Sequence, residues 1–175
     1  MNFVIRRRRD PDNSQCLALA ELVRRRDGYP PLGPIDIRHF LAPPYELAGW
    51  VAESNSKILG HAALHSTGFP VTIEKAVQCT GLPASSLGVV ARMFVAPESR
   101  RAGIAKALLD TVVSEAHQRG LRPILDTATH FDAAIKLYES AGFECAGEVT
   151  FVWADEPRLS GRVLIGPASA TPRTR

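Results

Sequence analysis

The 175-residue chain has few cysteines, few aromatic residues and no long apolar stretch. Its cysteines, Cys16, Cys79 and Cys145, are widely spaced and odd in number, which predicts neither a disulfide framework nor a CxxC metal pair. No apolar run approaches the ~20 residues that a membrane helix needs. The N-terminus leads directly into four arginines, so no secretory signal is expected. We therefore expect a cytoplasmic protein with free thiols, no bound metal and no membrane association.

An excess of charge of one sign is also lacking, because 21 basic residues are nearly balanced by 18 acidic ones. The basic residues include two arginine clusters, at 6–9 and 24–26. Nucleic-acid binding by such clusters typically needs them joined into a stripe with aromatic side chains that stack on bases, or a recognised motif, and the sequence shows neither. We interpret the clusters as the solvated ends of a strand and of a helix, and expect no nucleic-acid partner.

Hydrophobic residues make up 45% of the chain, enough for a core, and they follow strand and helix periodicities. Strands are predicted at 3–5, 47–53, 57–65, 87–95, 124–127 and 143–153, and helices at 14–26, 35–41, 73–80, 103–118 and 132–141. This order predicts one α/β domain with a mixed sheet over 1–165. Residues 166–175 are rich in Pro, Ala, Ser, Thr and Arg, which predicts a flexible tail.

A polar turn separates the apolar strand at 87–95 from the helix that starts near Gly103. The first amides of a helix have no intrahelical partner and carry partial positive charge, so this helix start favours phosphate binding. Gly103 lets a ligand approach the backbone, because it has no Cβ. Three basic side chains lie around it in sequence: Arg100, Arg101 and Lys106.

Three phosphate-binding motifs can be compared with this turn. A Walker A motif needs G-K-[ST], and the dinucleotide fingerprint needs three glycines; neither is present here. Arg100-x-x-Gly103-x-Ala105 resembles the R/Q-x-x-G-x-G/A signature of the GNAT acetyltransferases. Residues 92–97 look like the family's fourth strand, and 134–143 are similar to its A-I-x-L-Y-x-x-x-G-F segment.

The resemblance implies a GNAT-like fold: a twisted, mostly antiparallel sheet, flanked by helices, whose fourth and fifth strands splay apart. Those strands correspond to 87–95 and 124–127. It also implies that acetyl-CoA lies between them, with its pyrophosphate on the loop. The residues implied in cofactor binding are Met93, Phe94, Val95, Arg100, Arg101, Ala102, Gly103, Ile104, Ala105, Lys106 and His130.

The implied activity is N-acetyl transfer from acetyl-CoA to a primary amine, by direct attack through a tetrahedral intermediate. The backbone amide of Phe94 or Val95 is expected to polarise the thioester carbonyl. Tyr138 matches the family's tyrosine and is expected to be the general acid, since a phenol with a pKa of about 10 keeps its proton at neutral pH. The alternative is a catalytically silent acyl-CoA-binding or sensing domain of the same fold.

Two positions depart from the family pattern. Val89 stands where many members have a glutamate base, and Phe131 where they often have an asparagine that contacts the cofactor. His61 and His65 alternate on one strand face and are candidate bases, directly or through water. The other interpretation, which we favour, is a half-exposed strand face with two solvated histidines. His130 is the candidate to replace the asparagine.

The acceptor pocket is expected in the segments 27–34 and 66–86, which are rich in Gly and Pro, with Tyr29 and Phe69 as candidate lining residues. Neither segment carries a recognisable carboxylate clamp for a polyamine or a contact set for an aminoglycoside. The pattern therefore indicates an amine acceptor without identifying it, and a homodimer is compatible with the sequence.

Overall fold

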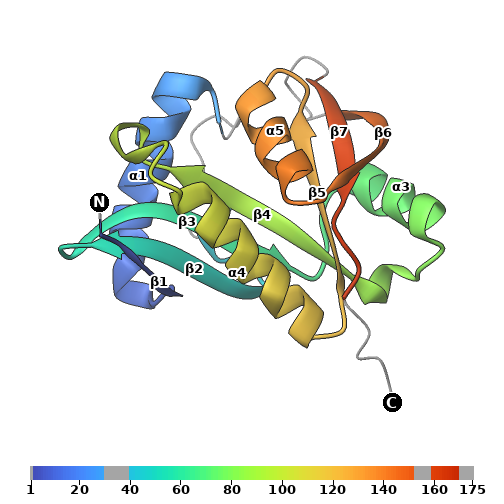
Figure 1. The fold of residues 1–175 in the computed structure, drawn as a ribbon, viewed down its shortest axis with the longest axis horizontal. Helices are drawn as coiled ribbons and strands as arrows, with labels where there is room; N and C mark the ends of the chain where they lie inside the picture. Colours follow the sequence, from blue (N-terminus) through green and yellow to red (C-terminus); the bar gives the residue numbers. More distant parts are fainter. Residues whose placement is uncertain (1, 30–39, 152–158, 170–175) are drawn as a thin grey trace. The chain divides into compact units, whose positions relative to one another are not determined.

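The computed structural model describes residues 2–29, 40–151 and 159–169 (Figure 1). The strands are β1 Val4–Arg7, β2 Glu46–Ser54, β3 Lys57–His65, β4 Leu87–Val95, β5 Arg122–Ala128, β6 Glu144–Phe151 and β7 Leu159–Ile165. The helices are α1 Asn13–Asp27, α3 Pro70–Thr80, α4 Ile104–Gln118 and α5 Asp132–Ser140. Phe40 and Leu41 are also helical, and the rest of the helix predicted at 35–41 lies outside the described residues.

The strands form one seven-stranded sheet in the order β1-β2-β3-β4-β5-β7-β6. The β4–β5 pair is parallel, and the pairs β1–β2, β2–β3, β5–β7 and β6–β7 are antiparallel. The parallel register covers Leu87–Val89 against Arg122–Ile124, although β4 continues to Val95 and β5 to Ala128. The predicted mixed, mostly antiparallel sheet is confirmed.

The chain falls into two compact units. The first comprises Met1–His65 and Val90–Val112, and the second comprises Ser66–Val89 and Val113–Arg175. The single domain over 1–165 stays a prediction.

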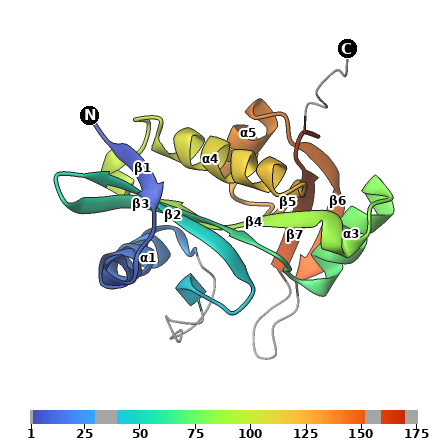
Figure 2. The same cartoon turned by 90° about the horizontal axis from the view of Figure 1, so that it is seen from below.

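The core of the first unit lies between α1 and strands β2 to β4. Its buried side chains are Cys16, Leu19, Ala20, Val23, Phe40, Leu41, Val51, Ile58, Phe94 and Ala96. The start of α4 packs on the opposite face of these strands (Figure 2). A Cβ on Gly60 of β3 would lie 3.0 Å from Leu108 and 3.1 Å from Ile104, so the absence of a side chain there allows α4 to approach closely.

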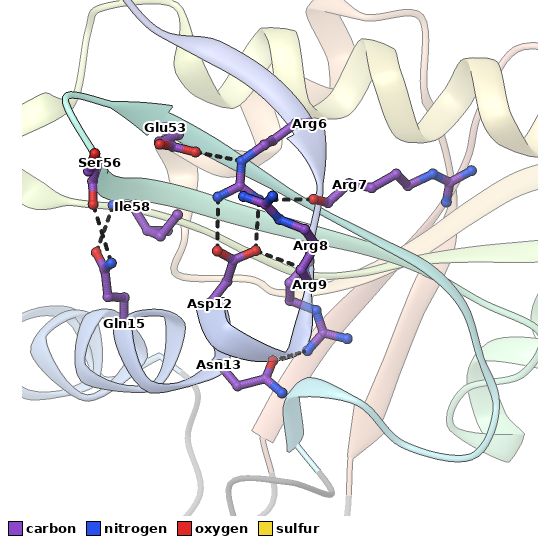
Figure 3. Close-up of polar contacts among 10 residues, drawn as sticks. All are labelled: Arg6, Arg7, Arg8, Arg9, Asp12, Asn13, Gln15, Glu53, Ser56 and Ile58. Atoms are coloured by element: carbon purple, nitrogen blue, oxygen red, sulfur yellow. Dashed lines mark hydrogen bonds and ion pairs between the residues drawn. The ribbon is translucent and has the colours of Figure 1, made fainter.

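The N-terminal arginine cluster is built into this unit (Figure 3). Arg6 binds both carboxylate oxygens of Asp12, at 2.7 and 2.8 Å, and Glu53 at 2.5 Å. This contact with Arg6 lowers the pKa of the buried Asp12 to about 2. Arg8 binds Glu46 at 2.5 Å, and Arg7 lies over the ring of Trp50 at 4.3 Å. The interpretation of this cluster as a solvated strand end is therefore wrong for Arg6 and Arg8, whereas Arg7 and Arg9 are exposed as expected.

The second cluster behaves differently, as an exposed helix end. Arg24 and Arg25 both bind Glu21, one turn earlier in α1, at 2.8 Å. The side chain of Arg25 is 74% exposed, so the predicted solvated helix end is confirmed there.

The second unit contains the element that the sequence did not predict, β7. A Cβ on Gly161 would lie 2.1 Å from the ring of Phe151, so this glycine lets the ring of β6 cover the β7 backbone. Residues 152 and 153 of the strand predicted at 143–153 lie outside the described residues.

Two contacts of the second unit also differ from expectation. Helix α3 begins at Pro70 instead of the predicted residue 73, since proline is well tolerated in a first turn, and Thr72 in this turn donates to Asp126 at 2.7 Å. Gly166 and Pro167, the first residues of the predicted tail, accept hydrogen bonds from Arg122 and His117. They are therefore attached to β5 and α4, and 170–175 lie outside the described residues.

Candidate active site

The segment between β4 and α4 lies entirely in the first unit and begins as a tight turn. The Ala96 amide donates to the Leu59 carbonyl of β3 at 2.8 Å, and Pro97–Ser99 form one turn of 3-10 helix. Two residues that follow have left-handed backbone: Arg101 at φ 65° and Gly103 at φ 82°. Turns of this kind orient successive backbone N–H groups outward, as in anion-binding loops.

The first turn of α4 offers free backbone donors. The first α-helical hydrogen bond runs from the Ala107 amide to the Gly103 carbonyl, at 3.0 Å. The amides of Ile104, Ala105 and Lys106 therefore have no intrahelical acceptor. A Cβ built on Gly103, the residue before these amides, meets no described atom within 4 Å, so the space beside this glycine is open. The helix start thus has the free amides that the prediction requires, and phosphate binding there stays a prediction.

The three basic side chains of the loop differ in their contacts. Arg100 forms an ion pair with Asp27 at the end of α1, and Lys106 binds Asp110 at 2.6 Å. Arg101 is exposed, and no ion pair is found for it within residues 2–29, 40–151 and 159–169. Exposed ion pairs contribute little free energy, so Arg100 and Lys106 can exchange their carboxylates for a bound anion. Ala102 is exposed, whereas Ile104 is buried and anchors the helix start.

The strand that leads into this loop is irregular. Arg92, in the middle of β4, has φ 53°, a left-handed conformation. Of the expected cofactor strand, Phe94 and Val95 are buried and Met93 is half-buried. The ring of Phe94 stacks on that of His61, with centroids 5.2 Å apart.

His61 and His65 are buried, so our favoured interpretation of a solvated strand face is wrong. Their exposed fractions are 0% and 2%, and burial lowers their pKa values to about 4 and about 3. His61 Nδ1 lies 2.8 Å from the Arg92 carbonyl, which is an acceptor, so Nδ1 carries the proton. Neither Nε2 has a hydrogen-bond partner among the described residues. A role for either histidine as base stays a prediction.

Glu46 is a largely buried carboxylate that the sequence pattern did not indicate, with its side chain 12% exposed. It stands opposite His65 in the β2–β3 register, and burial raises its pKa although Arg8 opposes the shift. Its Oε2 has no partner among the described residues. A glutamate at the start of a strand has no local sequence signature, because its burial depends on Arg8, 38 residues away. Two further carboxylates on the sheet are occupied by other contacts, since Glu53 binds Arg6 and Asp126 binds Thr72.

The remaining candidate residues lie in the second unit. Tyr138 of α5 is 7% exposed, with its ring centroid 6.0 Å from that of Phe143. His130 is exposed and its ring lies 4.2 Å from that of Phe131, the residue in place of the family's asparagine. Val89, in place of the family's glutamate, is buried beside Gly68. The roles of Tyr138 and His130 stay predictions.

Of the expected acceptor-pocket residues, Phe69 and Tyr29 are described. Phe69 is 37% exposed and its ring lies 5.1 Å from that of Phe151 at the end of β6. Tyr29 is partly buried against the core of the first unit. Both side chains are thus anchored by packing, and their contact with an acceptor stays a prediction.

Comparison with known proteins places these features in a family. Residues 16–143 match the model of the acetyltransferase (GNAT) family. The chain belongs to this family. It is 39% identical over 107 residues to N-acetyltransferase 8 of Homo sapiens, a match that covers 60% of this chain and 42% of that protein. The chain thus spans less than half of that relative's length.

Two further matches cover more of the compared proteins. The chain is 29% identical over 122 residues to peptidyl-lysine N-acetyltransferase YiaC of Escherichia coli K12, covering 70% of this chain and 65% of that one. The fold of the chain is similar to that of yncA from Salmonella typhimurium, which was solved with its cofactor acetyl-CoA. The TM-score is 0.67 and the sequence identity 17%, and the match covers 100% of this chain and 99% of that one. Among the described helices, none is long and apolar enough to cross a membrane.

Proposed function

We propose that this GNAT protein transfers an acetyl group from acetyl-CoA to a primary amine of a small molecule or a protein. The observation that carries the proposal is the start of α4, where three backbone amides have no intrahelical acceptor and the position of a Cβ on the adjacent Gly103 is open. An anion held there gains hydrogen bonds and the favourable end of the helix dipole.

The residues of this loop fit a pyrophosphate. The amides of 104–106 are donors for its oxygens, and Arg101 supplies a cation with no described ion-pair partner. Arg100 and Lys106 add charge when they leave Asp27 and Asp110. The strand Met93–Val95 runs directly into the loop, and in this proposal its backbone pairs with the pantetheine arm of the same molecule.

In this proposal the acceptor nitrogen attacks the thioester carbonyl, and the C–S bond breaks as the amide forms. An amide of Phe94 or Val95 stabilises the charge on the carbonyl oxygen. The hydroxyl of Tyr138 protonates the departing thiolate, and water carries away the proton of the amine. Tyr138 lies in the second unit, so its role rests on the sequence motif rather than on a distance to the loop.

The names of the two relatives support an amine acceptor, and one of them acts on peptidyl-lysine. The acceptor screen therefore pairs lysine-containing peptides and peptides with free α-amino groups with small amines. A cytoplasmic location and a homodimer remain part of the proposal.

The test has two arms on the wild-type protein. Titration calorimetry measures CoA binding, and thiol release from acetyl-CoA with the amine panel, read with product mass, measures transfer. We expect CoA binding and one class of amine acetylated. Binding without transfer to any amine would replace the proposal by the silent acyl-CoA-binding alternative, and the absence of CoA binding would reject both.

A further inference from the structure

Four non-glycine residues in the described part of the chain have left-handed backbone. Asn55 and Ser56 form the β2–β3 turn, and Arg101 lies in the loop before α4. Arg92 differs from them, because it lies inside a strand, two residues before Phe94. A residue with a Cβ keeps this conformation only where its surroundings impose it.

The surroundings of Arg92 hold both its backbone and its side chain. His61 Nδ1 donates to the Arg92 carbonyl at 2.8 Å. Arg92 Nε donates to the Phe40 carbonyl at 3.0 Å, and the guanidinium lies over the Phe40 ring at 4.3 Å. The His61 ring is in turn held against Phe94, with ring planes 17° apart. His61 and Phe40 thus fix Arg92 from two separate parts of the first unit.

The hydrogen bond from His61 also orients the next amide. In a trans peptide the C=O and N–H groups point in opposite directions. Because the Arg92 carbonyl points to His61, the Met93 N–H of the same peptide points away from it. This N–H belongs to the backbone segment that the proposed function pairs with the pantetheine arm.

His61 suits this task better than proton transfer. Its side chain is fully buried, and its Nδ1 already carries the proton that it donates to Arg92. Arg8 and Arg92 both disfavour a positive charge on the ring, as burial does, so the ring stays neutral and the hydrogen bond persists across physiological pH. His65 also lies on β3 and is buried, but no hydrogen bond from it to β4 is found among the described residues.

We propose that His61 is a positioning residue: its hydrogen bond to the Arg92 carbonyl holds the irregular turn of β4 that presents the Met93–Val95 backbone to acetyl-CoA. This inference rests on the proposed function. With this role His61 is no longer a candidate base, and it supports cofactor binding by positioning the backbone of β4.

The test compares variants by their dissociation constant for CoA, measured by calorimetry. His61→Asn keeps an N–H donor near the Nδ1 position, whereas His61→Leu and His61→Phe keep apolar bulk without a donor. We expect the variants without a donor to bind CoA about tenfold more weakly, and His61→Asn to stay within about threefold of the wild type. His65→Leu is the matched loss of a buried imidazole and is expected to leave CoA affinity unchanged.

A double-mutant comparison with Arg92 gives a second measurement. A merely structural role of His61 would not make its effect on CoA affinity depend on Arg92. Arg92→Gly tolerates the left-handed backbone without support. In that background His61→Leu is expected to weaken CoA binding by less than about threefold, a non-additive result. Full additivity would overturn the inference. So would a pH–rate profile that loses its acidic limb in His61→Asn, since that limb would make His61 the base.

The outcomes separate the two proposals. If the wild type binds CoA and a folded variant without a donor binds it equally well, the positioning role is wrong while the proposed function stands. If His61→Leu does not fold, His61→Phe and His61→Asn decide the question by the same comparison. If the wild type itself does not bind CoA, the proposed function fails and this inference fails with it.

Discussion

Two arginine-rich segments of the first unit, Arg6–Arg9 and Arg100–Arg101, are alike in sequence and differ in what their side chains contact. The first segment forms structural ion pairs, because Arg6 and Arg8 bind carboxylates of β2 and of the turn before α1. The second stands at an open helix start, where Arg101 is exposed. Basic residues therefore indicate a ligand site only where the fold leaves their charge, and nearby backbone donors, unsatisfied.

The largest effect on kcat is expected from a change at Tyr138. Such an effect would assign the chemical step to Tyr138 and leave only cofactor binding to the loop before α4. Tyr138→Phe removes only the hydroxyl, so the ring keeps its packing beside Phe143. General acid catalysis contributes roughly 10²–10⁴-fold, so kcat should fall in that range while KM for acetyl-CoA changes little. Steady-state kinetics measure both. Normal kcat would make Tyr138 a packing residue, and weaker CoA binding with normal kcat would make it a binding residue.

Acid should weaken the first unit through its buried histidines before it affects the arginine pairs. The pKa values of His61 and His65 are lowered to about 4 and about 3, so only the unfolded chain takes up these protons as the pH falls below 6.5. Stability is therefore full above pH 6.5 and is lost as the pH falls toward 4, by about 3 kcal/mol between pH 6.5 and 5.

Urea unfolding across this pH range measures the loss. Asp12 stays ionised throughout, because its pKa is about 2. The variant His65→Leu should show a shallower dependence on pH, because one buried titrating group is removed. An identical slope in that variant would argue against the buried, neutral state of His65.

Arg6→Met tests the structural side of the comparison. It leaves the buried Asp12 and the half-buried Glu53 without their cation, which should cost about 2 kcal/mol of unfolding free energy, and CoA affinity should not change. Arg101→Ala is the matched variant: its stability should stay within about 0.5 kcal/mol, while CoA affinity falls about threefold. Denaturant unfolding measures the stability and calorimetry the CoA affinity of both variants. A loss of CoA affinity in Arg6→Met, with a loss of stability in Arg101→Ala, would contradict the distinction between the two segments.

The smallest structural change is the addition of one methyl group, which can be made at either end of α4. Gly103 and Gly120 both have positive φ, 82° and 71°, and a Cβ on either meets no described atom within 4 Å. An alanine at either site should therefore carry the same backbone strain of about 1 kcal/mol. Only Gly103→Ala adds a methyl group next to the residues whose amides are free, so CoA affinity should fall about tenfold there and stay unchanged in Gly120→Ala. Equal CoA affinities of the two variants would show that the loop before α4 does not bind the cofactor.

The sequence predicted the parts of the molecule that depend on neighbouring residues. The apolar period of α4, the glycine at its start and the buried run of β4 are local patterns, and each element lies within a few residues of its predicted position. The motif around Gly103 likewise spans only six residues, so its geometry follows from the chain direction at one turn.

The contacts that were missed join distant parts of the chain. Arg6 and Glu53 are 47 residues apart, and His61 and Arg92 are 31 residues apart. The alternation of His61 and His65 on β3 predicted that they share a face, but exposure depends on what covers that face. Strand β7 was missed because Gly161, which is unfavourable in a strand by itself, is explained only by the ring of Phe151.

The most direct test of the central claim is the response of individual backbone amides to CoA. Titration of the 15N-labelled protein with CoA, followed by amide chemical shifts, reports on both arginine-rich segments in one experiment. We expect the largest shifts at Gly103–Lys106 and at Met93 and Val95, with Arg6–Arg9 nearly unchanged. Large shifts at Arg6–Arg9, with none at the start of α4, would contradict this expectation.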